Sequence, residues 1–253
     1  MIKLGVLGAG GRMGRRIIEL ANADKDFEVT VALERKGHPL SGKEIDTSAS
    51  LSVNGERSRT IERLKISSNP DGIFLVDAVI DFTIPQASTE NLGYVLKYKK
   101  PLVLGTTGFS DEELGRIKEA AKAIPVVFSP NMSIGVNLLF DLAGEVAGKL
   151  GGAYDIEIVE AHHKAKKDAP SGTAKKLAQG IADATGRNIA VHAVRAGDII
   201  GDHTIIYAGN QERIEIKHQA HSRDVFAIGA LRAVKWIVHK PAGLYSIRDV
   251  LKI

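Results

Sequence analysis

The opening segment of the chain places the tightest constraint on its fold. Ile2 to Leu7 is a short apolar run, and it leads directly into the glycine-rich sequence GAGGRMG. In the residues that follow, MGRRIIELANA, apolar side chains recur at helical spacing through Met13, Ile17 and Leu20. The segment therefore predicts a strand, a glycine turn and a helix in immediate succession.

A turn of this kind suits a dinucleotide. Pyrophosphate binding requires a tight strand-to-helix turn, close backbone approach and N–H groups at a helix start. Gly8, Gly10, Gly11 and Gly14 supply glycines at this junction, with Met13 standing where the common GxGxxG fingerprint has its third glycine. A purely structural turn would need similar residues, so the turn alone leaves both interpretations open.

Charged residues at the end of the second predicted strand strengthen the dinucleotide interpretation. Glu34 follows Leu33 and lies 20 residues after Gly14, where this class of site reads the ribose. Its carboxylate can accept hydrogen bonds from ribose hydroxyls, and Arg35 or Lys36 could pair with a 2′-phosphate. NADH and NADPH are both admissible, and a solvated charge cluster remains the alternative.

Strands alternate with helices through the first half of the chain, which predicts a parallel sheet covered on both faces. The polar stretch 37–70 interrupts this alternation and receives no assignment. Two loops, GTTGF at Gly105 to Phe109 and SPNMSIGVN at Ser129 to Asn137, follow strands where open parallel sheets bind ligands. The remaining expected strands are 27–33, 76–82, 101–104 and 125–128, and the expected helices are 86–98 and 111–123.

After Asn131 the pattern changes to one expected helix, 134–150, and then mostly strands, at 155–161, 189–195, 203–208 and 213–219. In RIEIKHQ apolar and polar residues alternate, which indicates a sheet with one face covered and the other wet or at an interface. Helices are expected at 173–185 and 225–239. We therefore expect a dinucleotide-binding domain at 1–130, to which 240–253 returns, and a mixed α/β domain at 131–239.

Composition excludes several classes of protein. The chain has 253 residues, 44% of them hydrophobic, and no cysteine, so disulfides, thiolate zinc sites and a cysteine nucleophile are ruled out. Neither a signal peptide nor a membrane-length apolar run is apparent, and a cytoplasmic protein is expected. The chain has a net charge of +4, but its basic residues are spread among acidic ones, which disfavours nucleic acid as a partner.

The most distinctive segment is EAHHKAKKDAPSGTA, at Glu160 to Ala174. It gathers two imidazoles and three ammonium groups, those of His162, His163, Lys164, Lys166 and Lys167. Such a cluster suits a small anion, although a polar strand end and a solvated lysine face are the plain alternatives. Metal binding is disfavoured because the neighbouring lysines repel a cation and no third ligand has suggestive spacing.

The same segment continues into a predicted helix start. Ser171 precedes the helix, and Gly172 and Thr173 fall where the first N–H groups of a helix point outward. A carboxylate docked there would gain backbone hydrogen bonds and the favourable end of the helix dipole. With the nearby cations, the expected ligand is a small dianion. A second polar cluster, at His218, His221 and Arg223, could line the pocket, an interface or a solvated loop and is not assigned.

Over essentially its whole length the chain resembles the 4-hydroxy-tetrahydrodipicolinate reductases, also called dihydrodipicolinate reductases. The resemblance rests on GAGGRMG, LER, DFT, GTTGF, SIGVN, EAHHKAKKDAPSGTA, GDHT and GLYSIRDVL. It implies a Rossmann-type parallel-sheet domain, a mixed α/β substrate-binding and tetramerisation domain, and NADH or NADPH as cofactor. SPNM departs from the alanines and aromatic residue that are common in the family.

The resemblance also implies roles for individual residues. His162 takes the position of the general acid/base and Lys166 that of the proton donor, while His163, Gly172 and Thr173 match substrate contacts. The implied cofactor contacts are Gly8, Ala9, Gly10, Gly11, Arg12, Met13, Glu34, Arg35, Gly105, Thr106, Thr107, Ser129, Pro130, Asn131 and Met132.

The implied reaction is reduction of 4-hydroxy-tetrahydrodipicolinate, a small dicarboxylate, in lysine and diaminopimelate synthesis. It proceeds by hydride transfer to C4 of the cyclic imine with proton supply from His162 and Lys166. A homotetramer in the cytoplasm is the implied setting. The alternatives are a different nicotinamide-dependent dehydrogenase and a non-catalytic NAD(H)-sensing protein.

Overall fold

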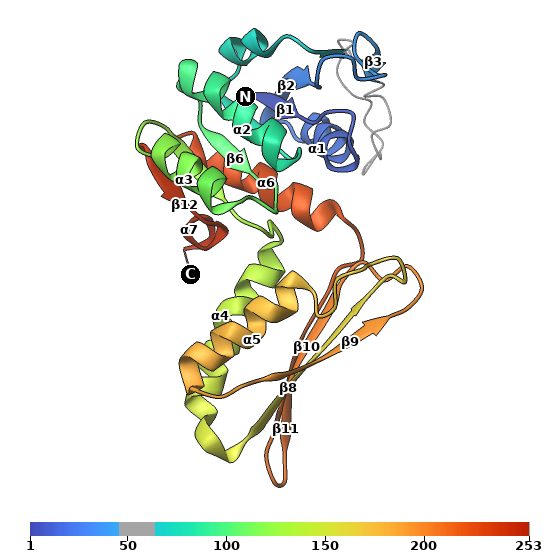
Figure 1. The fold of residues 1–253 in the computed structure, drawn as a ribbon, viewed down its shortest axis with the longest axis vertical. Helices are drawn as coiled ribbons and strands as arrows, with labels where there is room; N and C mark the ends of the chain where they lie inside the picture. The colour runs from blue at the N-terminus through green and yellow to red at the C-terminus, as the bar shows by residue number, and fades with distance from the viewer. Residues whose placement is uncertain (46–63, 253) are drawn as a thin grey trace. The chain divides into compact units, whose positions relative to one another are not determined.

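The computed structural model describes residues 1–45 and 64–252 and divides into two compact units. Unit 1 combines Met1–Met132 with Phe226–Lys252, and unit 2 comprises Ser133–Val225 (Figure 1). Part of the unassigned stretch 37–70 lies outside the described residues. Unit 1 is thus built from two separate parts of the chain, whereas unit 2 is continuous.

Unit 1 is organised around a sheet whose described strands follow the order β12-β7-β6-β5-β1-β2-β4-β3. Every pairing is parallel except that of β3 with β4. The strands from β4 to β7 follow the order of a Rossmann fold. In that order the sheet is built outward from β1, first to one side and then to the other. The strands are β1 (Ile2–Leu7), β2 (Phe27–Leu33), β3 (Glu44–Ile45), β4 (Leu64–Ser67), β5 (Ala78–Asp81), β6 (Leu102–Leu104), β7 (Pro125–Phe128) and β12 (Gly243–Tyr245).

Helices pack apolar residues against this sheet in two separate core clusters. One contains Ile17 of α1 (Arg12–Ala23) and Val234 of α6 (Asp224–Ile237), together with α7 (Ile247–Leu251). The other contains Val95 of α2 (Pro85–Lys97) and Ile117 of α3 (Asp111–Ala120), beside the 3₁₀ helix η1 (Pro70–Leu75). Strand β1 contributes to both clusters, through Val6 and Leu7 respectively. The predicted parallel sheet with both faces covered is confirmed.

Unit 2 contains a four-stranded mixed sheet, in the order β11-β10-β8-β9. Strand β10 pairs antiparallel with β8 and β11, and β8 pairs parallel with β9. Its strands are β8 (Asp155–His162), β9 (Ala190–Arg195), β10 (Asp202–Ala208) and β11 (Arg213–Gln219), and its helices are α4 (Ile134–Leu150), η2 (Gly151–Ala153) and α5 (Gly172–Thr185).

One face of the unit 2 sheet packs on α4 and α5. The core between them includes Ala143 of α4, Leu177 of α5, Ile158 of β8 and Tyr207 of β10. Tyr207 is fully buried, and its hydroxyl donates to the carbonyl oxygen of Ala143 at 2.9 Å. Burial strictly alternates along β8 and β10, as a sheet with one covered face requires.

Strand β8 extends one residue beyond the predicted range 155–161, to His162. The reason is a non-local pairing: His162 lies opposite Arg195 in β9, and its carbonyl oxygen accepts a hydrogen bond from the Ala196 N–H at 2.9 Å. Alternation therefore places His162 on the covered face, in line with Ile158 and Glu160. A histidine and a glutamate thus continue the row of core residues.

Candidate active site

The glycine turn of unit 1 is held tightly to the neighbouring strands. The N–H groups of Gly8 and Ala9 both donate to the carbonyl oxygen of Leu33, at 2.9 and 3.0 Å. Gly8 has a φ of +75°, a conformation that favours glycine. A Cβ atom at Gly8 would also lie 2.9 Å from Cγ2 of Thr83. The turn therefore requires glycine here for backbone conformation and for space.

The close packing of helix on strand depends on Gly14. A Cβ atom there would lie 2.1 Å from the Gly8 carbonyl oxygen and 2.8 Å from Cα of Ala9. The side chain of Met13, one residue earlier, is half-buried and packs on the core. Gly14 is therefore the glycine that lets the helix pack closely on the strand. In the common fingerprint that glycine lies one residue earlier, at the position of Met13.

The acidic residue at the end of β2 contacts the turn directly. Glu34 Oε1 accepts a hydrogen bond from the Gly10 N–H at 2.8 Å. Arg35 and Lys36, which follow it, are exposed. Gly11 caps α1 without a side-chain hydrogen bond, unlike the serine caps of α3, α4 and α5. A helix start that no side chain caps, beside a turn made of three glycines and Ala9, fits the pyrophosphate of a dinucleotide.

A buried carboxylate that the sequence did not single out lies at the end of β5. Asp81 is 1% exposed, and its Oδ1 accepts from the Thr83 N–H at 2.9 Å, the Thr83 hydroxyl at 2.6 Å and the Ser88 hydroxyl at 3.1 Å. Asn91 donates to Oδ2 at 3.2 Å. Burial raises the pKa of Asp81, and these hydrogen bonds oppose the rise. Sequence could have indicated it only as DFT at a strand end.

The Asp81 cluster extends to the loop after β6. The Thr106 hydroxyl accepts from the Thr83 N–H at 3.0 Å and is bonded to Ser88 at 2.8 Å. Thr106 is therefore 3% exposed, whereas the adjacent Thr107 is exposed. The cluster fixes the loops after β5 and β6 to each other at the carboxyl edge of the sheet.

The loop after β7 contains the remaining predicted cofactor residues. Ser129 is buried, and its hydroxyl donates to the carbonyl oxygen of Asn131 at 2.8 Å, while Pro130 is exposed. Met132 is 1% exposed and belongs to the core. It packs against Gly229, where an added Cβ atom would lie 1.8 Å from the Met132 carbonyl oxygen. The structure thus collects the predicted cofactor residues at the carboxyl ends of β1, β2, β6 and β7.

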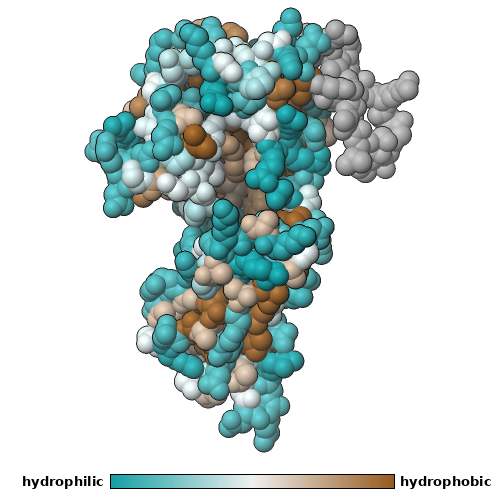
Figure 2. Space-filling view, turned by 45° about the vertical axis from the view of Figure 1, so that its right-hand side comes forward, coloured by the Kyte–Doolittle hydropathy of each residue, from teal (hydrophilic) through white to brown (hydrophobic). Residues whose placement is uncertain are grey.

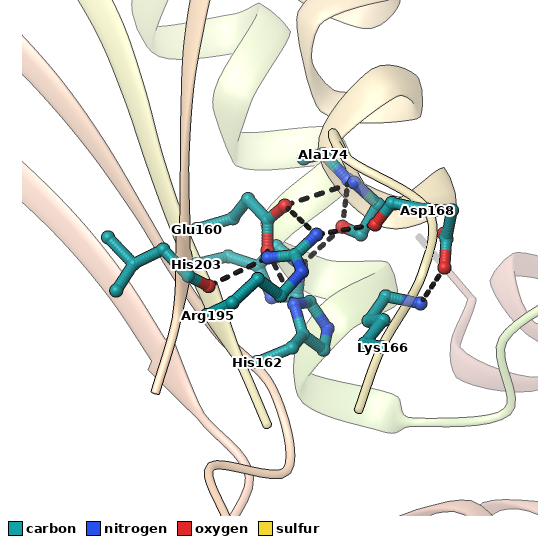
Figure 3. Close-up of polar contacts among 9 residues, drawn as sticks. Glu160, His162, Lys166, Asp168, Ala174, Arg195 and His203 are labelled. Carbon is teal, nitrogen blue, oxygen red and sulfur yellow. Dashed lines mark hydrogen bonds and ion pairs between the residues drawn. The ribbon is translucent and has the colours of Figure 1, made fainter. Parts of the chain in front are cut away.

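In unit 2, polar side chains gather at the end of β8 around Glu160, which is fully buried (Figure 3). Nδ1 of His162 lies 2.5 Å from Glu160 Oε2, and Ser171 N–H donates to Oε1 at 3.1 Å. Arg195 donates from both terminal nitrogens, to Oε2 at 3.0 Å and to Oε1 at 2.8 Å. Glu160 begins the segment that the sequence singled out but received no role there, and Arg195 lies outside that segment.

These contacts set the ionisation states of Glu160 and His162. Burial alone would raise the pKa of Glu160, but hydrogen bonds from Arg195, His162 and Ser171 outweigh it and hold the pKa below its ordinary value. Burial lowers the pKa of His162, which the neighbouring Glu160 partly offsets. Glu160 is therefore a carboxylate at neutral pH, and the charge of His162 is sensitive to any anion that binds beside it.

Lys166 lies in the loop between β8 and α5. Its ammonium group pairs with Asp168 Oδ1 at 2.8 Å, and its side chain is 23% exposed (Figure 3). His163 is half-buried, whereas Lys164 and Lys167 are exposed. Lys166 therefore packs against the protein, whereas Lys164 and Lys167 lie in solvent.

The helix start that follows is built as the sequence predicted. The Ser171 hydroxyl caps α5 by accepting from the Ala174 N–H at 3.2 Å. Gly172 and Thr173 are the first residues of the helix, Gly172 exposed and Thr173 half-buried. Because the Ser171 N–H bonds to Glu160, the same carboxylate joins the imidazole of His162 to the start of α5.

Two further histidines lie on the covered face of the sheet. His203 pairs with Glu160 across β8 and β10, is 3% exposed, and packs its ring edge-on to His162 with 5.3 Å between centroids. Burial lowers its pKa to about 4. His218, opposite His203 in β11, is half-buried with Nε2 3.5 Å from the Ser133 hydroxyl. His221 and Arg223 are exposed.

Two family models together match almost the whole chain. The N-terminal model of the family described as dihydrodipicolinate reductase matches residues 2–132, and the C-terminal model matches residues 135–251. The chain belongs to the dihydrodipicolinate reductase family. The resemblance inferred from sequence is confirmed, and with it the class of enzyme: an oxidoreductase that uses NADH or NADPH.

Individual relatives match along their whole length. A 4-hydroxy-tetrahydrodipicolinate reductase of Syntrophus aciditrophicus (strain SB) is 42% identical, covering 99% of this chain and 98% of the relative. Another, of Geotalea uraniireducens (strain Rf4), is 43% identical with 99% of each covered. A dipicolinate-bound dihydrodipicolinate reductase structure from Paenisporosarcina sp. TG-14 has the same fold, with a TM-score of 0.77, 24% identity and 97% of each chain covered.

Within 1–45 and 64–252, no group of three or more histidine, aspartate or glutamate side chains could hold a metal ion. Among the helices of the same ranges, none is long and apolar enough to cross a membrane.

Proposed function

We propose that the chain reduces 4-hydroxy-tetrahydrodipicolinate to tetrahydrodipicolinate in lysine and diaminopimelate biosynthesis. The observation that carries this is the relative of that name, 42% identical over 99% of the chain. In the balanced reaction the 4-hydroxyl leaves as water, and one hydride and one proton enter. When bound, NADH or NADPH supplies the hydride that adds at C4 of the unsaturated cyclic imine.

We assign the cofactor to unit 1, which combines Met1–Met132 with Phe226–Lys252. The open start of α1 receives the pyrophosphate, since Gly11 caps it without a side-chain hydrogen bond. Glu34 binds the ribose hydroxyls, and the exposed Arg35 faces a 2′-phosphate when NADPH binds. The loops at Gly105 to Thr107 and Ser129 to Met132 bind the remaining part of the cofactor. Both cofactors are accepted.

We assign the substrate to unit 2, Ser133–Val225. The predicted range 131–239 was too long at its end, because α6 packs in the core of unit 1. One substrate carboxylate docks on the N–H groups of Gly172 and Thr173, at the positive end of the helix α5 dipole. His163 and the lysines of the preceding loop bind the second carboxylate. Two carboxylates on one small ring match one helix start and one cationic loop, which is why a dicarboxylate suits this site.

His162 and Lys166 supply the proton. Hydride addition at C4 pushes electrons toward the ring nitrogen, and a cationic donor stabilises the charge that develops. The dianionic substrate itself favours the charged form of His162, offsetting the burial that lowers its pKa. Lys166 must exchange its Asp168 partner for the substrate in order to act.

The active form is a cytoplasmic homotetramer assembled through unit 2. Apolar side chains gather on the surface of this unit that faces the viewer in Figure 2, and its exposed large apolar side chains include Leu138, Val194 and Ile214. Strand β11, which contains Ile214, lies at the edge of its sheet. Light scattering at micromolar concentration tests this, and a monomer would contradict it.

One assay tests the function. Oxidation of NADPH is followed by absorbance in the presence of the cyclic imine generated from pyruvate and aspartate semialdehyde. Consumption of the cofactor that depends on both enzyme and imine is expected. If folded protein binds the cofactor but oxidises none of it, the chain is a non-catalytic NAD(H)-sensing protein or a dehydrogenase with another substrate.

A further inference from the structure

The proposed reaction assigns no role to the buried ion pair beside His162, Glu160 with Arg195. We propose that Glu160 and Arg195 form a positioning pair that fixes the proton of His162 on Nδ1 and presents Nε2 as the proton-donating atom. The proposal rests on the proposed reductase function, because it assigns how His162 is held for that reaction. Neither residue contacts the substrate in this scheme.

The hydrogen bonds of Glu160 determine which nitrogen carries the fixed proton. An ionised carboxylate can only accept hydrogen bonds, so Nδ1 of His162, 2.5 Å from Oε2, must be protonated. The other contacts of Glu160 are donors as well, from Arg195 and from the Ser171 backbone. Glu160 therefore has no proton to give, and the imidazole is left with Nε2 as its exchangeable position.

The surroundings of Nε2 support this assignment. A Cβ atom at Gly201 would lie 3.1 Å from Nε2 of His162, so any larger residue there would cover this nitrogen. Gly201 is itself buried and precedes β10. The backbone is therefore built to leave room at the nitrogen that Glu160 does not occupy.

Arg195 connects this imidazole to the substrate-binding elements. It lies opposite His162 in the parallel pairing of β8 with β9, and its Nη2 also donates to the Asp168 carbonyl oxygen at 2.5 Å. Glu160 at the same time accepts from Ser171 at the start of α5. One ion pair thus fixes the proton-donating ring relative to the Lys166 loop and to the carboxylate-binding helix start.

The charges that face His162 come from several elements. Glu160 on β8 favours the imidazolium form, whereas Lys166 in the loop and Arg195 on β9 disfavour it. His203 on β10 contacts the ring edge-on and is neutral at pH 7, because burial lowers its pKa to about 4. Removing Glu160 or Arg195 should therefore change the pKa of His162 in opposite directions.

In the catalytic step the proton on Nε2 moves to the reduced substrate, and the imidazolium becomes a neutral imidazole. Nδ1 keeps its proton, and Glu160 remains a carboxylate throughout. Activity then falls as pH rises through the pKa of His162. This descending limb of the pH profile reports the pair directly.

The first test compares Glu160→Gln with Arg195→Gln. Glu160→Gln should lower kcat about 100-fold and leave the KM for NADH within about twofold, because general acid catalysis by His162 is weakened while the cofactor site in unit 1 is intact. Its descending limb should move about one pH unit lower. Arg195→Gln should move the limb higher. Limbs that move in the same direction in both variants, or not at all, overturn the proposal.

The chain offers a matched control on the same strand. Glu157 pairs with His192 at 2.7 Å, but both side chains are largely solvent-accessible, at 45% and 60%. Glu157→Gln removes the same kind of carboxylate–imidazole contact and should leave kcat and the pH profile unchanged. An effect as large as that of Glu160→Gln would mean that the response is not specific to the buried pair.

A second measurement needs neither substrate nor a stable variant. Nitrogen-15 NMR of the cofactor-free wild-type protein, above the pKa of His162, should show a proton on Nδ1 and a bare Nε2. A proton on Nε2 instead would overturn the proposal. A wild-type protein with the expected tautomer but no reductase activity would refute the proposed function and still support the positioning pair.

Discussion

Gly14 and Gly8 approach so closely that a Cβ atom on Gly14 would lie 2.1 Å from the carbonyl oxygen of Gly8. No side-chain rotation relieves that overlap, because the obstacle is backbone. We therefore expect Gly14→Ala to lower the free energy of unfolding by about 3 kcal/mol or more, as for severe overpacking. Urea denaturation measures the loss.

Gly115 supplies the control for this prediction. It lies inside α3, is exposed, and a Cβ atom there would meet nothing within 4 Å. Gly115→Ala should raise the free energy of unfolding by about 0.5 to 1 kcal/mol through helix propensity. Similar losses in both variants would show that the contact with Gly8 is not what matters.

Arg35 and Lys36 should decide how well a 2′-phosphate is tolerated. Both are exposed beside Glu34, and neither is needed to bind the ribose hydroxyls. Replacing both with alanine should weaken NADPH about 10- to 100-fold, the loss of one or two charged hydrogen bonds, and change NADH little. Fluorescence titration gives both Kd values. Equal weakening of the two cofactors would contradict the assignment.

His162 and Lys166 should affect turnover and not cofactor binding. Alanine at either position should lower kcat about 10²- to 10⁴-fold, because a proton donor is lost. The Kd for NADH should stay within about threefold, since the cofactor is assigned to unit 1. Lys149→Ala, which changes an exposed lysine near the end of α4, is the control. Near-normal turnover in both catalytic variants would remove their role.

Burial of His203 should make the protein less stable in mild acid. Its pKa is lowered from 6.5 to about 4, so between these values the unfolded chain binds a proton that the folded state excludes. The free energy of unfolding should fall as pH drops from 6.5 to 4, by on the order of 3 kcal/mol at most. His203→Gln should flatten this slope in denaturation curves. An unchanged slope would exclude His203 as the cause.

Asp81 should affect the affinity for the cofactor, because it fixes the loops after β5 and β6. Asp81→Asn retains an acceptor but cannot satisfy every donor around it, and Thr83 and Thr106 should lose their fixed positions. We expect NADH to bind about tenfold more weakly, equivalent to about 1.4 kcal/mol. Calorimetry of cofactor binding to the folded variant checks this. Wild-type affinity would mean that the cluster serves stability alone.

The regular part of the fold could be predicted because apolar periodicity determines it. The ranges of β1, β2, β7, β11 and α4 match those predicted to the residue. The short strands β3 and β4 were not predicted. β4 adds one fully buried side chain, Ile66, and joins the sheet through its pairing with β2, so the sequence has no periodic signal there.

The candidate site was predicted only in part, for a similar reason. His162 and the start of α5 belong to one continuous segment, so their proximity could be inferred along the chain. Arg195 is distant in sequence and meets Glu160 only through the pairing of β8 with β9. One signal was available: Glu160 follows Ile156 and Ile158 at a spacing of two, which places a carboxylate in a row of core positions.

The last strand, β12, pairs with β7, and α6 completes the core beside β1. During synthesis, residues 133–225 leave the ribosome before 226–252, which unit 1 needs for its core. Domains usually complete folding from the N-terminus onward. Here unit 2, in the middle of the chain, can complete its folding first. Unit 1, which contains the glycine turn, cannot complete its folding until α6 and α7 have been synthesised. Nascent chains stalled before residue 226 should therefore not bind NADH.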